Sequence, residues 1–279
     1  NVKVALSGDG GDEVFGGYNR YLYADKYLDK FNRMPLWLQK SLQNLIYSFP
    51  KDKWSNLFNY LPKKYSHSQG GDKLYKLASV IGKDNIEIYQ KLISDWQFTD
   101  GLIYSDNEYQ DNDYDSDPYF SGKYPVEYMQ LMDQMHYLPD DILRKIDRAS
   151  MVNSLEVRVP LLDHRIIEKL WNLPRGYKIN NGVSKVILRK ILGKYVPSVN
   201  FQRKKAGFSL PISEWLRGPL REWAEGLLSR DLIMRHGLLN PDVINNKWNE
   251  HQSGKNNWHE HIWSVLMFNG WYEHWVEKN

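Results

Sequence analysis

The order of apolar and polar residues at the start of the chain predicts a strand, a turn and a helix. Residues 2–6 form a short apolar run rich in β-branched residues, which is typical of a buried β-strand. Residues 7–17 contain five glycines and predict a loop. Between about residues 18 and 31, bulky apolar side chains recur at helical spacing. The chain therefore opens as a strand that runs through a glycine-rich turn into a helix.

Helical patterns dominate the rest of the chain. An acidic, polar stretch at 105–118 predicts an exposed loop or a locally disordered insertion. Its alternating aspartates lack the glycine and the terminal glutamate of a calcium-binding loop. A compact extended segment is predicted at 155–162. Further helices are predicted at 73–96, 128–154 with an interruption at Pro139, 165–173, 185–195, 212–230 and 258–277.

The opening strand needs partners, because an isolated strand is not stable. We expect those partners either in a segment that precedes residue 1 or in short strands that the pattern does not reveal. The chain also opens without a methionine and directly on a strand. Both observations favour a fragment that was cut at a domain boundary and is mostly α-helical in the part that is present.

Composition restricts the class of protein. The 279 residues are 42% hydrophobic and 25% charged, which is ordinary for a globular chain that buries a core. The formal net charge of +3 is too small to indicate nucleic acid or an anionic membrane, and no apolar run approaches the roughly 18 residues of a membrane span. The absence of cysteine excludes disulfides and thiol nucleophiles, and it suits a cytoplasmic protein.

The turn Ser-Gly-Asp-Gly-Gly-Asp-Glu at residues 7–13 has the chemistry of a nucleotide site. Glycines let the backbone approach a ligand closely, and successive amides in such a turn attract anions. Asp9 and Asp12 would repel a bare phosphate unless a cation lies between, and Mg²⁺ held by carboxylates and phosphates is a common arrangement. The loop therefore favours a Mg–nucleotide or pyrophosphate site. A tight acidic turn without a ligand is the alternative, since neither the Walker spacing nor GxGxxG is present.

Five blocks of the sequence resemble motifs of the asparagine synthetase family and occur in the family's order. The turn and its continuation to Tyr18 are similar to SGxGxDExFGGY. The other four blocks are YLPDDILRKIDRASM at 137–151, LEVRVPLLD at 155–163, SKVILR at 184–189, and RKKAGF at 203–208 with Pro211 and Trp215. Five blocks in order make the resemblance highly specific, although each alone is only moderately so.

The resemblance implies a fold and a domain organisation. Members of the family combine an N-terminal glutaminase domain with a C-terminal synthetase domain. The synthetase domain has the α/β adenine-nucleotide α-hydrolase-like (HUP) fold, in which helices flank a parallel sheet. Residues 1–279 would be a partial synthetase domain, its larger C-terminal part. The glutaminase domain and the SGGxDS pyrophosphate loop are absent from this chain.

The resemblance also implies a reaction in two halves. ATP adenylates a substrate carboxylate, with aspartate as the first choice, and pyrophosphate leaves. Ammonia from glutamine then displaces AMP and forms an amide. The expected cofactors are ATP and Mg²⁺, and the expected partners are these small molecules and a glutaminase domain; a homodimer is compatible with the chain. The isolated fragment is expected to be inactive because it lacks half of the site.

Within the turn, the resemblance assigns roles residue by residue. Ser7, Gly8 and Gly10 match positions that bind the nucleotide. Asp9 matches the acidic position tied to the acyl-adenylate, where many relatives have the longer glutamate. Asp12 matches a carboxylate associated with Mg²⁺.

Two further residues carry implied catalytic roles. Lys185 matches the lysine that stabilises charge in the adenylation step. A lysine at the start of a helix opposes the helix dipole, so a bound anion is a reasonable cause, whereas a solvated lysine is the alternative for this residue alone. Asp141 lies within about one residue of the acidic position that assists ammonia attack. A helix cap with an ion pair to Lys145, four residues on, is the alternative for Asp141.

Other functions stay open at this point. The acceptor of the amide can be a different acid, such as a sugar acid in surface-polysaccharide synthesis or a group that closes a β-lactam ring. A non-catalytic nucleotide-binding or scaffolding remnant of the fold is a second class of protein. An upstream SGGxDS loop and an N-terminal cysteine nucleophile would exclude the remnant.

Several other features have simpler structural interpretations. Glu156 and Arg158 favour an ion pair beside a proline turn over a role in orienting substrate, which also remains open for Asp163. The basic run 203–205 favours loop ordering near the nucleotide. Histidines near the C-terminus favour surface positions over a metal site: His251, His259 and His261. A stripe at four-residue spacing predicts a helix face that packs into the core: Trp263, Met267, Trp271 and Trp275.

Overall fold

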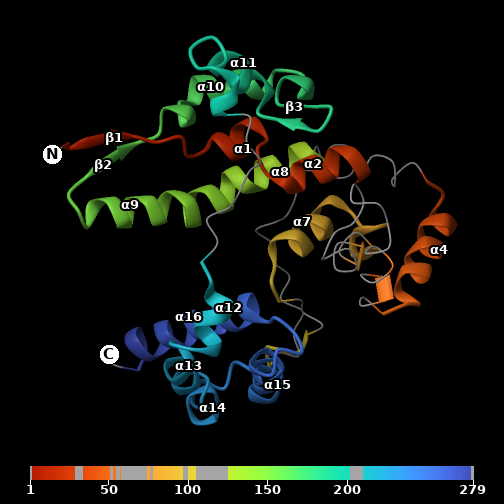
Figure 1. Ribbon diagram of the computed structural model, residues 1–279, viewed down its shortest axis with the longest axis vertical. Helices are drawn as coiled ribbons and strands as arrows, with labels where there is room; N and C mark the ends of the chain where they lie inside the picture. The colour runs from red at the N-terminus through yellow and green to blue at the C-terminus, as the bar shows by residue number, and fades with distance from the viewer. Residues whose placement is uncertain are drawn as a thin grey trace. The chain divides into compact units, whose positions relative to one another are not determined.

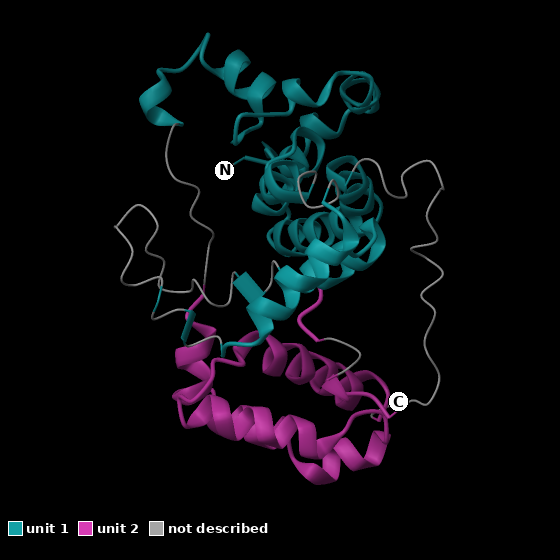
Figure 2. Cartoon of the chain, turned by 90° about the vertical axis from the view of Figure 1, so that its right-hand side faces the viewer, with its two compact units in different colours: residues 1–92, 112–203 teal, residues 93–111, 204–279 magenta. Residues whose placement is uncertain are grey.

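The computed structural model, shown in Figure 1, describes residues 2–28, 34–50, 53–54, 57, 74–75, 78–96, 100–104, 125–201 and 210–277. The chain forms two compact units (Figure 2). The first unit consists of residues 1–92 and 112–203, and the second of residues 93–111 and 204–279. The glycine-rich turn and Lys185 both belong to the first unit.

The predicted first strand is β1 (Val4–Leu6), and its partner lies within the chain. β1 pairs in parallel with β2 (Glu156–Arg158), so that Ala5 stands opposite Val157 (Figure 1). Of the two expected sources of a partner, a short strand hidden in the pattern is therefore confirmed. The prediction of a buried strand is wrong for the described chain, because Val4 is 40% and Leu6 is 74% exposed.

Helices predominate, as predicted. Apart from β1 and β2, the described residues contain one other strand pair, the antiparallel β3 (Ile179–Asn180) and β4 (Val183–Ser184). The wider parallel sheet of the implied α/β fold is not seen in the described part of the chain. Helical elements of the first unit include α4 (Leu36–Tyr47), α7 (Asn85–Ile93), η5 (Pro160–Leu162), α10 (His164–Trp171), η6 (Arg175–Tyr177), α11 (Val186–Leu192) and η7 (Ser198–Asn200).

The loop predicted at residues 7–17 contains a short helix, and the helix predicted after it is divided into two pieces. α1 (Gly11–Phe15) is a single short helix whose two flanking glycines, Gly10 and Gly16, have φ values of 77° and 71°. Only glycine adopts such left-handed conformations without strain, which explains the glycines at these positions. α2 (Asn19–Tyr23) then continues into a π-helical turn, η1 (Ala24–Leu28).

A long helical segment runs through α8 (Pro125–Met132), η4 (Asp133–Leu143) and α9 (Arg144–Met151) (Figure 1). Pro139 was expected to interrupt it; instead the helix widens into the π-helical η4. Proline has no N–H to donate and its ring crowds the carbonyl of the preceding turn, so a wider turn accommodates it without ending the helix.

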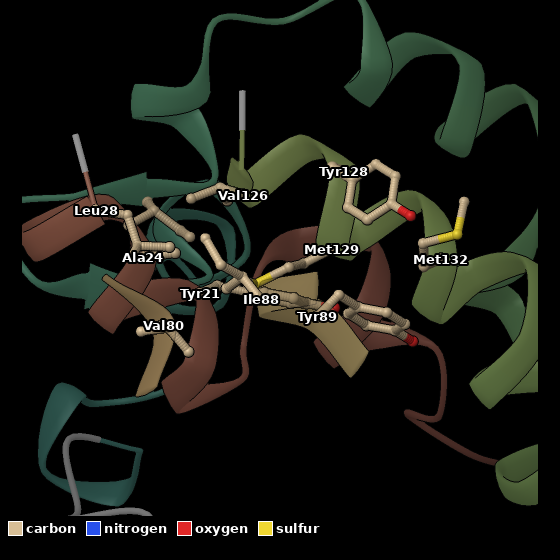
Figure 3. Close-up of a cluster of buried hydrophobic side chains, with 11 residues drawn as sticks. Tyr21, Ala24, Leu28, Val80, Ile88, Tyr89, Val126, Tyr128, Met129 and Met132 are labelled. Atoms are coloured by element: carbon tan, nitrogen blue, oxygen red, sulfur yellow. The ribbon is translucent and has the colours of Figure 1, made fainter. Parts of the chain in front are cut away.

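The main core of the first unit forms where α2, η1, α7 and α8 meet. Tyr21, Ile88 and Met129 are almost completely buried at its centre (Figure 3). The cluster also contains Ala24, Leu28, Val80, Tyr89, Val126, Tyr128, Met132 and Ile179. Because α2 follows the glycine-rich turn in sequence and Gln130 of α8 binds the Glu13 carbonyl, the core holds the scaffold on which the turn rests.

A buried carboxylate directly follows this core along the chain. Asp133 is fully buried, and its carboxylate accepts hydrogen bonds from the hydroxyl of Tyr89 at 2.8 Å and from the hydroxyl of Tyr21. Arg20 Nε donates to the same carboxylate at 3.1 Å, and a terminal nitrogen of Arg20 lies 2.7 Å from it. The guanidinium lies 4.1 Å above the ring of Tyr18. A buried charge needs such partners, and here they join α2 to α7 and η4.

The second unit is helical. The helix predicted at 212–230 is two helices, α12 (Ile212–Arg217) and α13 (Arg221–Leu227), separated at Gly218. α14 (Arg230–His236) and α15 (Pro241–Gln252) were not predicted. The start of α15 has a readable signal, since the Asn240 side chain caps the helix and Pro241 is its first residue. The last helix, predicted at 258–277, is α16 (His259–Trp275).

The prediction for one face of α16 is wrong. Met267, Trp271 and Trp275 are 42%, 53% and 60% exposed. Of the four residues in the stripe, only Trp263 packs against a core. Steps of four residues advance the stripe by about 40° each around a helix of 3.6 residues per turn, so the stripe rotates away from the face on which it starts. The buried residues of α16 are Ile262, Val265, Leu266 and Asn269. Among all described helices, none has both the length and the apolar character that a membrane span requires.

The buried Asp133 network generates a prediction for stability. Asp133→Asn keeps the shape of the side chain but removes the charge that Arg20 faces. We expect the free energy of unfolding to fall by about 3 kcal/mol, as it does when a buried ion pair loses one partner. Urea unfolding measures the change. Asp242→Asn is the matched control, because Asp242 pairs with Arg230 at 2.6 Å on the exposed surface and its loss should be much smaller. Equal losses in the two variants would contradict the role of Asp133.

Candidate functional site

The turn after β1 is held by short-range hydrogen bonds. Ser7 N donates to Arg158 O at 2.9 Å, which extends the β1–β2 pairing by one residue. The Ser7 hydroxyl donates to the carboxylate of Asp9, and the Asp9 amide donates back to Ser7 Oγ at 3.4 Å. Gly10 lies so close to η5 that a Cβ at this position would be 2.1 Å from Leu162 Cδ2. Three of the predicted nucleotide-site residues therefore lie in one tightly packed turn.

Side-chain amides from α8 and η4 hold α1 in place. Gln130 Nε2 donates to Glu13 O at 2.9 Å, and Gln134 Nε2 donates to the same carbonyl at 3.2 Å. Trp171 Nε1 in turn donates to Gln134 Oε1 at 3.2 Å. The last carbonyls of a helix lack partners within the helix, so these amides stabilise a helix of only five residues. They thereby fix the position of Asp12, which lies within α1.

Asp12 and Lys185, separated by most of the first unit in sequence, form an ion pair. Lys185 Nζ lies 3.1 Å from Asp12 Oδ1, and the two side chains are 26% and 28% exposed. Gly17 packs against both, because a Cβ there would be 2.0 Å from Asp12 Oδ1 and 2.3 Å from Lys185 Cε. The structure thus brings together the residue expected to hold Mg²⁺ and the lysine expected to stabilise phosphate charge.

The backbone of Lys185 is unusual. Lys185 is the N-cap of α11, not its first residue as predicted, and has the left-handed conformation φ 54°, ψ 38°. Non-glycine residues adopt this region rarely, and a residue kept there often marks a functional constraint. The preceding β3–β4 hairpin holds it, since Val186 N donates to Lys178 O at 3.1 Å and Arg189 Nε donates to Ser184 O at 2.9 Å. The hairpin therefore directs the lysine towards the turn.

Glu13, which the sequence reasoning did not single out, lies beside this pair. Its side chain is 1% exposed and accepts a hydrogen bond from the Tyr18 hydroxyl at 2.5 Å. Burial raises the pKa of the Glu13 carboxyl above its usual range, although the Tyr18 hydrogen bond acts in the opposite direction. The signal for Glu13 was present in the sequence, because it directly follows Asp12 in the turn.

Asp141 lies on η4, where it is exposed. Burial, followed by the charge of Asp141, raises the pKa of Tyr137. The Tyr137 ring is 5.9 Å from that of Tyr18, which binds Glu13. Tyr137 and Tyr18 thus connect Asp141 with the turn. The alternative ion pair of Asp141 with Lys145 is not seen in the described residues, where Asp141 lies on η4 and Lys145 on α9.

The described residues contain no group of three or more histidine or acidic side chains that could hold a metal ion. A cage built from protein ligands alone is therefore not seen in them. Asp12 fits a different kind of site, in which Mg²⁺ uses one or two carboxylates and completes its coordination with phosphates and water. The histidines near the C-terminus were expected at surface positions. His251 is nevertheless fully buried, not at the surface, and its Nδ1 accepts the Trp258 N–H at 3.2 Å.

The simpler interpretations of other polar residues hold where the structure describes them. Arg158 Nε lies 2.7 Å from Glu156 Oε1 in an exposed ion pair. Asp163 accepts the Arg165 N–H at the start of α10 and also binds the Arg165 side chain, which lowers the pKa of Asp163. The acidic stretch 105–118 and the basic run 203–205 lie outside the described residues.

The first unit therefore combines a glycine-rich turn with a partly buried carboxylate and lysine, an arrangement whose charges suit a charged ligand. Comparison with known proteins identifies the family. The sequence model described as asparagine synthase matches residues 1–273, and the chain belongs to the asparagine synthase family.

Individual relatives support this assignment. Asparagine synthetase [glutamine-hydrolyzing] 1 of Bacillus subtilis is 30% identical over 286 residues, which cover 100% of this chain and 41% of the relative. Asparagine synthetase [glutamine-hydrolyzing] 3 of Bacillus subtilis is 26% identical and covers 85% of this chain and 31% of its own length. Amidase chry2 of Gibberella zeae is 22% identical over 85% of this chain and 36% of its own length. The chain thus spans at most 41% of these relatives. No solved structure matches the chain.

The packing at Gly17 generates a prediction. Gly17→Ala places a methyl group against Asp12 and Lys185, so we expect the free energy of unfolding to fall by about 2 kcal/mol through overpacking. Gly8→Ala is the matched control, because nothing lies within 4 Å of a Cβ at Gly8. Denaturant unfolding of both variants measures the difference. A Gly17→Ala variant as stable as Gly8→Ala would show that the ion pair is not packed as described.

Proposed function

We propose that this chain carries the AMP-side and lysine-bearing part of an ATP-dependent ligase. The ligase adenylates a carboxylate, aspartate as the first choice, and converts it to an amide with ammonia derived from glutamine. The observation that carries the proposal is the Asp12–Lys185 pair beside the glycine-rich turn. Membership of the asparagine synthase family supports the class of reaction.

The charges of the site suit the adenylation half. Attack of a carboxylate on the α-phosphate creates negative charge on that phosphate and on the departing pyrophosphate, and preorganised cations stabilise such charge. Lys185 supplies one cation from a fixed backbone position. Asp12 would hold Mg²⁺, which when bound shields and orients the phosphates. Ser7, Gly8 and Gly10 would contact the nucleotide through the turn.

We assign two acidic residues, Asp9 and Asp141, to the second half of the reaction, in which ammonia attacks the acyl-adenylate. Asp9 lies in the turn and would face the acyl-adenylate, although in the described structure its carboxylate binds the Ser7 hydroxyl. Asp141 is exposed and would assist the attack of ammonia on the adenylate. The connection of Asp141 to the turn through Tyr137 supports this placement. A glutaminase domain elsewhere in the protein would supply the ammonia.

The acceptor is the part of the proposal that the relatives constrain least. Relatives that cover most of this chain carry the names asparagine synthetase and amidase. A different acid is therefore the second candidate for the acceptor. Incubation of the complete gene product with ATP, glutamine and candidate acids tests both, because the proposal requires AMP and pyrophosphate as products. ADP and phosphate as products would refute the proposal for every acceptor.

The role of Lys185 gives a prediction for activity. Lys185→Ala should nearly abolish amide synthesis, because the charge on the departing pyrophosphate loses a fixed cation, and should leave glutamine hydrolysis intact. The two rates are measured as AMP release and glutamate release. Lys190→Ala is the matched control, since Lys190 is an exposed lysine of the same helix, α11. Retained synthesis in Lys185→Ala would refute the proposed role of the lysine.

A further inference from the structure

The Asp12–Lys185 pair is a built feature of the first unit, not a chance surface contact. Lys185 reaches Asp12 from a left-handed backbone position, and Gly17 leaves the space that the two side chains fill. Each side chain is about three-quarters buried. Attraction between charges is stronger at such a site than in open water, so removing either charge has a larger effect on its partner than at the surface.

The proposed function gives each member of this pair a second partner. Lys185 would bind phosphate and Asp12 would bind Mg²⁺, but in the described structure the two side chains bind each other. If Lys185 alone moved to a phosphate, the Asp12 carboxylate would lose its cation and lie close to another negative group. Like charges at short distance repel, and the partly buried position makes that repulsion costly. A phosphate and a cation that enter together give Lys185 and Asp12 each an oppositely charged group in place of the other.

We propose that the Asp12–Lys185 ion pair makes the site selective for the metal complex of the nucleotide over the metal-free nucleotide. The inference rests on the proposed function and adds a specificity-determining role for Asp12. Asp12 rejects metal-free ATP through its charge and through its hold on Lys185.

For a residue expected to hold a metal ion, Asp12 should behave unusually when its charge is removed. Removing the Asp12 charge should weaken binding of Mg–ATP but tighten binding of metal-free ATP. The test is equilibrium dialysis of radiolabelled ATP against the complete gene product, once with MgCl₂ and once with EDTA. We expect Asp12→Asn to bind ATP in EDTA at least about tenfold more tightly than the unaltered protein does, equivalent to about 1.4 kcal/mol. The two affinities of Asp12→Asn should therefore converge.

Three further variants complete the test. Asp12→Ser also removes the charge, so a folding defect of Asp12→Asn alone does not decide the outcome. Lys185→Met should lower the affinity for ATP in EDTA further, because the phosphate loses its cation and Asp12 keeps its charge. Asp242→Asn is the control of equal charge change, made at an exposed pair in the second unit, and should leave both affinities unchanged.

The outcomes separate the inference from the proposed function. Tighter binding in EDTA by both Asp12 variants supports the inference. If both variants weaken Mg–ATP binding and leave ATP binding in EDTA unchanged, the inference is overturned while the proposed metal role of Asp12 stands. If the unaltered protein binds ATP in neither condition, the proposed function itself fails.

Discussion

One ion pair connects the two parts of the chain on which the proposed chemistry depends. Asp12 lies in the short helix after the glycine-rich turn, and Lys185 precedes α11, yet their charged atoms are 3.1 Å apart. Such a pair is worth more than one on the open surface because water screens it less. The backbone on both sides is adapted to it, by the absence of a side chain at Gly17 and by the left-handed conformation of Lys185. The position of each residue is therefore a condition for the position of the other.

The pair in turn depends on the helical segment behind it. A helix of five residues is not stable alone, because nucleation costs more than so few hydrogen bonds return. α1 persists since Gln130 and Gln134 bind its last carbonyls and Tyr18 binds Glu13. Those glutamines flank Asp133, whose buried charge joins α2 to η4. The geometry of the site is thus set by polar side chains of α8 and η4. None of these side chains is assigned to the nucleotide or the metal ion in the proposed function.

Local sequence signals explain what could be predicted. The strand, the glycine-rich turn and the family motifs each act over a few residues, and they correctly indicated that a strand and a turn open the chain. The motifs also assigned both Asp12 and Lys185 to a nucleotide site, and the structure pairs the two residues. Features set by tertiary contacts were not predictable. Lys185 pairs with Asp12, and the buried His251 accepts a hydrogen bond from Arg217 at its backbone carbonyl; both partners are far away in sequence. The exposed stripe of α16 shows the same limit, because spacing alone does not say which face of a helix another element covers.

We propose that the Asp12–Lys185 ion pair breaks when a metal-bound nucleotide enters, so that Lys185 binds a phosphate and Asp12 binds the metal ion. A crystal structure of the complete gene product with Mg²⁺ and an ATP analogue that resists cleavage between the α- and β-phosphates tests it most directly. The account predicts that Lys185 Nζ leaves Asp12 and contacts a phosphate oxygen, while Asp12 faces the metal ion. An intact Asp12–Lys185 pair beside a bound nucleotide, or a nucleotide bound away from the glycine-rich turn, would contradict the account.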